Sequence, residues 1–485
     1  MGEFFSALAR PASMHRSETE AWALDQFGKA ALGDARRTAR LVEVAARAAE
    51  RPSGKLSEVF ESARELDAAY DFVEREQTKV QALQSAVGKA TAERCTGDLY
   101  VSVPVDGSSL QLTDAAGEKD FGSIGTADRG ARGLKVISAL AVGADGVPIG
   151  LLAQTWWARP VPVPRSAKER RRLRTRKRVD EKETRHWLET IEQAAEQLNA
   201  VGARGWFQLD READAWPTLL TLEVTGHRFT VRSAWDRLVG AGGHDKQYLR
   251  ARLAATKPIG TFDLDVPASS GRSARRAHMV MHAAQATLQL RDRRTDRMRR
   301  LTIYAVWVYE QGTTPCGEKP LEWRLLTNAP IVTSDARIVV LGYSSRWRIE
   351  EFHKTWKTGG CNVEMLQLRS RNAVIRWATI LAVVATRIER LKRLARAEVQ
   401  RPATDELTEI EVEVLIALKR RRKKRTERMP DGMPTIAQAV GWIADIGGYT
   451  GKSSGGPPGA ITIGRGLERL RQAVEGVLAM RGASE

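Results

Sequence analysis

Two short apolar segments of this sequence each end at an aspartate, and that pattern limits the folds open to the chain. Residues 99–105 are followed by Asp106, and residues 205–209 are followed by Asp210. Apolar segments of this length and composition favour buried strands, and ligand sites commonly lie just beyond the ends of strands. A simple turn at Asp106 and Gly107 is the alternative. The sequence predicts two buried strands with a carboxylate at the exit of each.

A third acid lies in residues 343–359, which the sequence predicts to be one helix. The segment holds good helix formers and no proline, and it ends at two glycines. At about 100° per residue, one stripe carries four side chains: Tyr343, Arg346, Glu350 and Lys357. The carboxylate could hold a metal ion while the cations bind phosphate oxygens, or the stripe could be a solvated face of ion pairs. Spacing alone leaves both interpretations open.

The same segment resembles a known family. Its pattern Y-x2-R-x3-E-x6-K is similar to the signature of bacterial cut-and-paste DDE transposases of the IS-four family, and the run RWRIEEFHKTWKTG is Tn-five-like. The resemblance covers most of residues 20–400. It implies that Asp106, Asp210 and Glu350 are the catalytic and metal-binding residues, brought together by an RNase H-like fold.

The resemblance also implies a metal-dependent reaction on DNA. Three neighbouring carboxylates repel one another, so compensating cations are expected. Hard oxygen ligands favour Mg2+ or Mn2+, and two Mg2+ ions can activate the attacking oxygen and stabilise the leaving oxygen. We therefore expect a site for two Mg2+ ions in which Mn2+ substitutes. The implied reaction nicks transposon ends, passes through a hairpin that water reopens, and joins the 3′ ends to target DNA.

Several further residues are expected to contact DNA. The resemblance implies phosphate contacts for the tyrosine and the two cations of the predicted stripe. Arg232 is a candidate for a phosphate contact or a structural ion pair. Trp323 is most simply a packed aromatic residue, and the resemblance implies that it stacks on a base extruded from the duplex.

An amphipathic helix near residue 40 carries three more candidates. Asp34 is its expected N-cap, and its first turns hold Arg36, Arg37 and Arg40. These arginines can form a solvated face or contact DNA. The segment AALGDARRTARLV resembles the end-binding domain of the family, which favours contact with DNA.

Composition supports double-stranded DNA as the partner. The net charge is +18 and the isoelectric point is near 10.0, and neutralising phosphates releases counterions. The sequence has no apolar stretch of 18 residues, which argues against a membrane. Three scattered cysteines favour reduced thiols and a cytoplasmic location. Two basic runs, residues 165–178 and 419–428, are candidates for DNA contact or for solvated segments.

The predicted fold class is α/β, with an RNase H-like mixed sheet between two helical domains. The expected domains are residues 1–90, which bind DNA ends; residues 91–398, which are catalytic; and residues 399–485, which form a helical dimerisation domain. A β-rich insertion is expected at about residues 234–325 of the catalytic domain. A homodimer is implied by the resemblance. A catalytically inactive DNA-binding derivative and an RNase H-fold nuclease without strand transfer remain alternatives.

Overall fold

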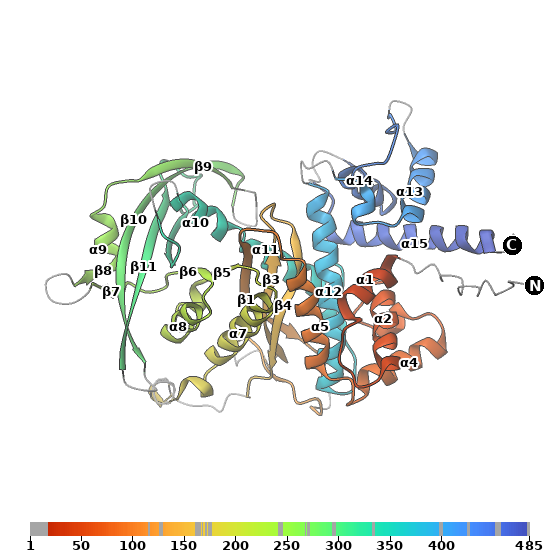
Figure 1. Ribbon diagram of the computed structural model, residues 1–485, viewed down its shortest axis with the longest axis horizontal. Helices are drawn as coiled ribbons and strands as arrows, with labels where there is room; N and C mark the ends of the chain where they lie inside the picture. The colour runs from red at the N-terminus through yellow and green to blue at the C-terminus, as the bar shows by residue number, and fades with distance from the viewer. Residues whose placement is uncertain are drawn as a thin grey trace, which may run out of the picture.

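The structure is a computed structural model in which a large sheet lies beside a helical body. It describes residues 18–114, 117–125, 130–160, 166, 168–169, 172, 177–240, 246–266, 268, 272–292, 297–331, 335–396, 401–423, 427–451 and 457–482. Figure 1 shows the long helix α12 (Arg371–Leu394) standing between the sheet on one side and the helices of the N-terminal and C-terminal parts of the chain on the other. Most of the basic run 165–178 lies outside the described residues.

Twelve strands form one mixed sheet in the described part of the chain. They are β1 (Val101–Gln111), β2 (Gly122–Ser123), β3 (Arg132–Val142), β4 (Pro148–Trp157), β5 (Gly205–Leu209), β6 (Arg228–Arg232), β7 (Leu238–Val239), β8 (Gln247–Tyr248), β9 (Gly260–Val266), β10 (Arg275–Asp292), β11 (Arg297–Glu310) and β12 (Glu322–Thr327). Their order is β2-β3-β1-β5-β6-β12-β11-β10-β7-β8, with β4 beside β3 and β9 beside β10.

The strands β4, β3, β1, β5 and β6 make up the part of the sheet that carries the predicted acids. The first three are antiparallel, whereas β1, β5 and β6 run parallel to one another. Helix α7 (Thr184–Ala200) connects β4 to β5, and α8 (Trp216–Val224) connects β5 to β6. This connectivity is consistent with an RNase H-like fold, and the two predicted buried strands are present.

The first of these strands differs from its prediction. Strand β1 does not end at Asp106 but continues to Gln111, and Asp106 pairs with Ser138 of β3. The antiparallel partner extends beyond the parallel one and keeps the chain extended. Asp106 therefore lies inside a strand, at the point where pairing with β5 stops.

The segment between β6 and residue 335 is β-rich, as predicted. Strands β10 and β11 form a long hairpin, and β12 pairs with β11 on one side and with β6 on the other. Helix α9 (Leu249–Ala254) packs against β10. The added strands therefore extend the same sheet rather than forming a separate one.

The predicted single helix over residues 343–359 is wrong. The structure has α10 (Asp335–Ser344), a turn, α11 (Trp347–Lys354) and a π-helical turn, Thr355–Gly359. The Ser345 hydroxyl bonds to the Gly342 carbonyl and to the Ser102 hydroxyl of β1, at 2.6 and 2.7 Å. Such side-chain bonds compete with the backbone hydrogen bonds that would continue a helix.

The remaining helices lie in the N-terminal and C-terminal parts of the chain. They are α1 (Glu18–Phe27), α2 (Ala35–Glu50), α3 (Leu56–Val59), α4 (Ala63–Glu74), α5 (Val80–Glu93), α13 (Glu409–Arg422), α14 (Ile436–Ile446) and α15 (Ala460–Gly482). Short 3-10 turns cover Val179–Glu181, Arg211–Ala213, Val363–Met365 and Ala403–Asp405. Asp34 caps α2 as predicted, because its side chain accepts a hydrogen bond from the Arg36 amide at 2.8 Å.

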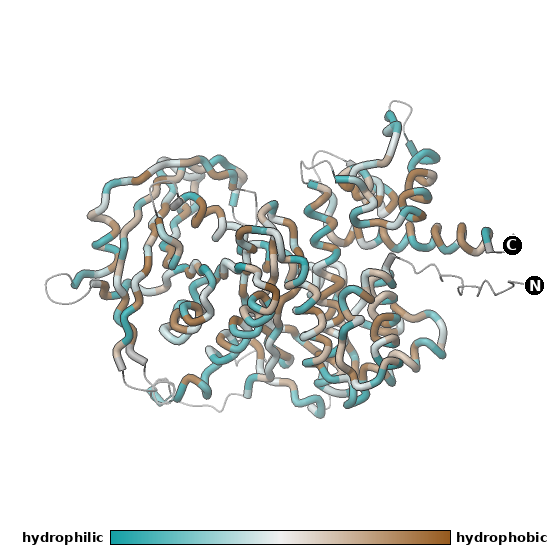
Figure 2. Tube along the Cα trace, viewed as in Figure 1, coloured by the Kyte–Doolittle hydropathy of each residue, from teal (hydrophilic) through white to brown (hydrophobic). Residues whose placement is uncertain are grey.

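Helix α12 unites these parts in one core. Its side chains are almost all buried, and it contacts β4, α2, α4, α5 and α11. Figure 2 shows apolar residues along α12 and along the strands and helices beside it. The indole of Trp377 donates to the Gly54 carbonyl at 3.1 Å, and Arg376 donates to the Val73 carbonyl at 2.7 Å. The N-terminal helices therefore share a hydrophobic core with the sheet and α12.

Acid should destabilise this core through His353 of α11. The ring lies beside Phe352 and Trp356, and its Nε2 has no hydrogen-bond partner. Burial lowers the pKa of His353 to about 3, with Lys357 and Arg346 adding repulsion. Below about pH 6.5 the unfolded chain binds a proton here that the folded chain rejects, so the free energy of unfolding falls as pH falls.

The slope from this one group is expected to reach about 1.4 kcal/mol per pH unit below pH 6. Urea unfolding of the wild type and of His353→Phe between pH 5 and 7.5 measures it. The variant should lose this component, whereas the exposed His278→Gln control should keep it. Parallel pH profiles for wild type and His353→Phe would contradict the assignment.

Candidate active site

The register of β1 and β5 places two of the predicted acids side by side. Val105 and Leu209 are the last paired residues, so Asp106 and Asp210 follow at the same level of two neighbouring parallel strands. Residues at one level of a parallel pair project to the same face of the sheet. Asp106 accepts from the Gly107 amide, and Asp210 accepts from the Glu212 amide, each at 2.8 Å.

The third acid, Glu350, is linked to Asp106 through an arginine. Helix α11 packs against β1 and carries Glu350 in its first turn. The Arg346 guanidinium lies 3.1 Å from Asp106 Oδ2, and its other amino group forms an ion pair with Glu350 Oε1. One guanidinium therefore bridges the strand acid and the helix acid.

The electrostatics of Asp106 reflect this crowding. Burial raises the pKa of Asp106 to about 7, Arg346 acts in the opposite direction, and the charges of Asp210 and Glu350 raise the pKa further. Burial alone would lower the pKa of Arg346, but Asp106, Tyr343 and Glu350 raise it above its usual value. Three acids facing one arginine leave the site short of positive charge.

The donor set fits a hard divalent cation, but the ligands are not gathered around a preformed site. In the described part of the chain, no three His, Cys, Asp or Glu side chains are clustered closely enough to hold a metal ion. Arg346 lies between Asp106 and Glu350 and engages both. The carboxylate oxygens are the ligands that Mg2+ and Mn2+ prefer. A cation held by all three acids requires Arg346 to release at least one of them.

Three of the residues predicted to contact DNA, namely Tyr343, Arg232 and Trp323, lie near Asp210. The Tyr343 ring is buried and meets the Trp323 ring in an edge-to-face arrangement at a centroid distance of 5.9 Å. Burial raises the pKa of Tyr343, whereas Arg346 and Arg232 act against that rise. Arg232 ends β6 and donates to the Glu322 carbonyl at 3.1 Å. Trp323 is thus a packed aromatic residue in this structure, with part of its surface exposed.

Lys357 departs from the predicted stripe. It lies in the π-helical turn, where an extra residue changes the direction of the side chains that follow. Its Nζ is 3.4 Å from the carboxylate of Glu364, which also accepts from the Gln111 amide of β1. Lys357 is therefore held near the far end of β1 by an acid that sequence reasoning did not single out.

Sequence reasoning also missed the residue that fixes the other face of α11. The Glu351 carboxylate forms ion pairs with Arg348 at 3.0 Å, with Lys392 at 3.9 Å and with Arg393. The last two residues belong to α12. The only sequence signal was that Glu351 faces about 100° away from Glu350.

The three N-terminal arginines lie on α2 rather than at the carboxylates. Arg36 is exposed, Arg37 donates to the Leu32 carbonyl at 2.8 Å, and Arg40 pairs with Glu43 at 2.9 Å.

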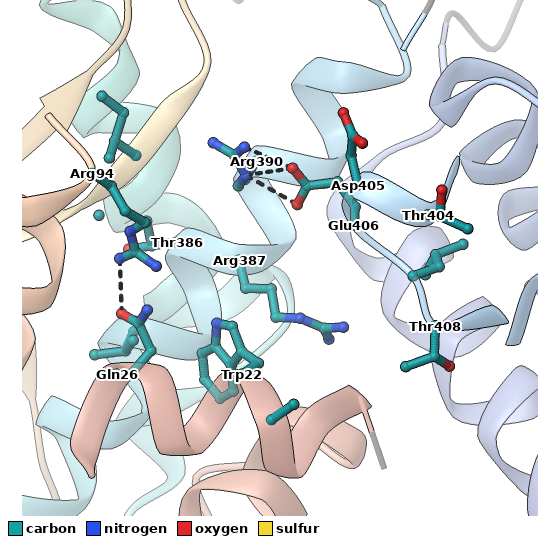
Figure 3. A pocket seen from close by; sticks show the side chains of 15 residues that line it. Trp22, Gln26, Arg94, Thr386, Arg387, Arg390, Thr404, Asp405, Glu406 and Thr408 are labelled. Carbon is teal, nitrogen blue, oxygen red and sulfur yellow. Dashed lines mark hydrogen bonds and ion pairs between the residues drawn. The ribbon is translucent and has the colours of Figure 1, made fainter. Parts of the chain in front are cut away.

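A cavity of about 420 Å3 lies away from the carboxylates, between α1, α12 and residues 404–408 (Figure 3). Arg387 stands over the Trp22 ring there, and none of the three predicted acids lines the cavity.

The structure has an α/β core with carboxylates at neighbouring positions of its sheet, and comparison with known families identifies the class of protein. Residues 19–78 match the family described as Transposase DNA-binding. Residues 122–387, more than half of the chain, match the Transposase DDE domain. The protein therefore belongs to the DDE transposases, enzymes that cleave DNA and transfer strands in a metal-dependent reaction. Such enzymes generally use divalent metal ions, and the DNA-binding match supports DNA as the partner.

Asp106 precedes the range of the DDE match, which begins at residue 122. Its place beside Asp210 is therefore known from the strand register alone. Among the described helices, none is long and apolar enough to cross a membrane. The three cysteines are free thiols, two of them buried.

The unfavourable burial of the Asp106 carboxylate should have a measurable effect on the stability of the DNA-free protein. Because the folded pKa is about 7 and the unfolded pKa about 4, this group lowers the free energy of unfolding as pH rises through that interval. Asp106→Asn should therefore be more stable than the wild type at pH 8 by about 1–3 kcal/mol, and the gain should disappear near pH 4.

Urea unfolding in the presence of a chelator measures this difference. Asp214→Asn is the matched control: Asp214 is buried and paired with Arg237, so that change should destabilise the protein. An Asp106→Asn protein less stable than the wild type at pH 8 would refute the electrostatic account.

Proposed function

We propose that this transposase performs cut-and-paste transposition as a Tn-five-like member of the IS-four family. The observation that supports this most is the register that sets Asp106 beside Asp210, with Glu350 joined to Asp106 through Arg346. The spacing of Tyr343, Arg346, Glu350 and Lys357 agrees with the family signature.

In the proposed site, Asp106, Asp210 and Glu350 hold two Mg2+ ions, for which Mn2+ can substitute. Bound metal of this kind activates an attacking oxygen and stabilises a leaving oxygen during phosphoryl transfer. Arg346 is the internal counter-ion of the free protein, and it binds a phosphate oxygen once the acids have released it. The guanidinium suits this exchange, because its fork fits carboxylate and phosphate equally well.

Other side chains position the DNA in this proposal. The Tyr343 hydroxyl and Arg232 contact phosphates beside Asp210, and Lys357 contacts a phosphate after leaving Glu364. Trp323 stacks on an extruded base, with Tyr343 supporting its edge. Arg36, Arg37 and Arg40 contact the DNA end from α2. No covalent intermediate with the protein is needed, because water or a 3′ hydroxyl supplies each attacking oxygen.

In this proposal the chain has three domains, which follow one another in sequence. Residues 1–90 bind the transposon end, residues 91–398 are catalytic with a β-rich insertion at about 234–325, and residues 399–485 dimerise. Two protomers hold two ends in a homodimer in the cytoplasm. The reaction passes through a DNA hairpin before the 3′ ends join target DNA.

Product analysis on DNA carrying the transposon ends tests the proposal against its alternatives. Hairpins followed by insertions are expected. Complexes without cleavage would instead indicate an inactive DNA-binding derivative, and cuts without joining would indicate an RNase H-fold nuclease.

Replacing Asp210 should separate binding from chemistry. Asp210→Ala removes one proposed metal ligand, so nicking is expected to fall at least about 1,000-fold, while the affinity for end DNA changes little. Gel-shift and single-turnover nicking assays measure the two effects. The neighbouring exposed Glu212→Ala is the control and should nick normally. Substantial nicking by Asp210→Ala would remove Asp210 from the site.

Replacing Lys357 should affect a later stage of the reaction than replacing Asp210 does. Lys357→Ala removes a proposed phosphate contact, so complexes formed after cleavage should dissociate about 5–50-fold faster. Their lifetime can be followed by competitor challenge on pre-cleaved ends. Lys354→Ala, an exposed lysine one turn earlier on α11, should leave the lifetime unchanged. Equal lifetimes for the wild type and Lys357→Ala would contradict the role.

A further inference from the structure

A large aromatic side chain is exposed close to the edge of the sheet where the acids lie. Trp235 follows the end of β6 by three residues, and 65% of its surface is accessible. Tyr248, where β8 meets α9, is 58% accessible. Tryptophan usually buries most of its area, so an exposed ring held by a folded segment indicates a surface that binds something.

The turn that carries Trp235 is fastened to the segment that follows Asp210. The Ala234 amide donates to Asp214 Oδ2 at 2.7 Å, and Arg237 bonds both to the carbonyl and to the carboxylate of Asp214. Asp214 has no exposed side-chain surface and lies four residues after Asp210. The Ser233 hydroxyl donates to the Trp235 carbonyl at 3.0 Å. The backbone on both sides of Trp235 is therefore fixed relative to Asp210.

The charged residues around this turn favour the binding of a polyanion. Exposed cations on the neighbouring segments are Arg211, Lys246 and Arg250, and Arg232 lies three residues before Trp235. The exposed acids of the same segments are Glu212 and Asp236, and Asp236 accepts a hydrogen bond from the Arg250 amide at 3.0 Å. Aromatic rings interleaved with cations are typical of surfaces that bind single-stranded or distorted nucleic acid.

The Trp323 ring is less accessible for stacking on a base than the Trp235 ring. Its ring is partly buried and meets the Tyr343 ring in an edge-to-face arrangement. Part of the Trp323 ring is therefore already in contact with Tyr343, whereas the faces of an exposed ring are open to a base.

We propose that Trp235 is a second stacking platform, on which a nucleobase of the DNA strand entering the carboxylate site lies. The stack positions the scissile phosphate relative to Asp210, so Trp235 is a positioning residue. This inference rests on the proposed function of the carboxylates, and it adds an aromatic contact from the β6–β7 connection.

Scanning the end DNA with 2-aminopurine tests the proposal, because stacking on indole quenches this fluorescent base. With the wild-type protein, one position near the cleavage site should be quenched on binding. Trp235→Ala should abolish that quenching and slow single-turnover nicking about tenfold, while the affinity for end DNA changes less than threefold. Trp235→Phe should restore most of both signals. An abasic substitution at the quenched position should slow the wild type and add little to Trp235→Ala.

Two controls separate stacking from other roles. Val224→Ala removes an exposed apolar side chain at the end of α8, four residues before β6 begins, and should change neither signal. Trp235→Ala should keep the wild-type unfolding midpoint and the wild-type mass in light scattering.

Unchanged quenching and nicking in Trp235→Ala would overturn the proposal. A lowered unfolding midpoint that Trp235→Phe fails to restore would show a packing role instead, and loss of dimer mass would show a protein interface. If the wild type binds end DNA but never nicks it, the proposed function fails, while the quenching still reports whether Trp235 stacks on a base.

Discussion

One guanidinium joins the sheet to helix α11. Arg346 is bound to Asp106 of β1 and to Glu350 of α11, at the place where two parallel strands bring a second aspartate alongside. Like charges held this close would repel, and Arg346 offsets only part of that repulsion, because the pKa of Asp106 still stands near 7. The carboxylates therefore lack compensating positive charge, and divalent cations compensate them far better than a proton does.

Helix α11 is held from two sides. Arg346 ties α11 to the sheet, while Glu351 ties it to α12 through Lys392 and Arg393. Helix α12 also packs against α2, α4 and α5, which lie within or next to the range matched by the DNA-binding family. A single packed body therefore runs from the helices matched by the DNA-binding family to Glu350. The N-terminal helices are thereby connected to Glu350 through packed side chains.

Much of this arrangement follows from local sequence patterns. The two buried strands, the β-rich insertion and the cap of α2 at Asp34 all lie where their patterns predict. The DDE transposase class is confirmed by the family matches. The catalytic roles of Asp106, Asp210 and Glu350 stay a prediction, although the structure brings all three to one edge of the sheet.

The errors have tertiary causes. Strand β1 runs past Asp106 because β3 pairs with it there, and no local pattern reveals that partner. The break before α11 depends on a hydroxyl contact between Ser345 and Ser102, which are 243 residues apart. Lys357 leaves the stripe because the helix widens into a π turn. The exposure of Trp235 likewise depends on Asp214 holding its turn outward.

The central claim is that Asp106, Asp210 and Glu350 share divalent ions once Arg346 lets go of them. Anomalous diffraction from crystals of the protein with end DNA and Mn2+ tests this most directly. The account predicts manganese peaks contacting all three carboxylates, with the Arg346 guanidinium moved onto a DNA phosphate. Manganese bound away from any of these acids, with Arg346 still bridging Asp106 and Glu350, would contradict it.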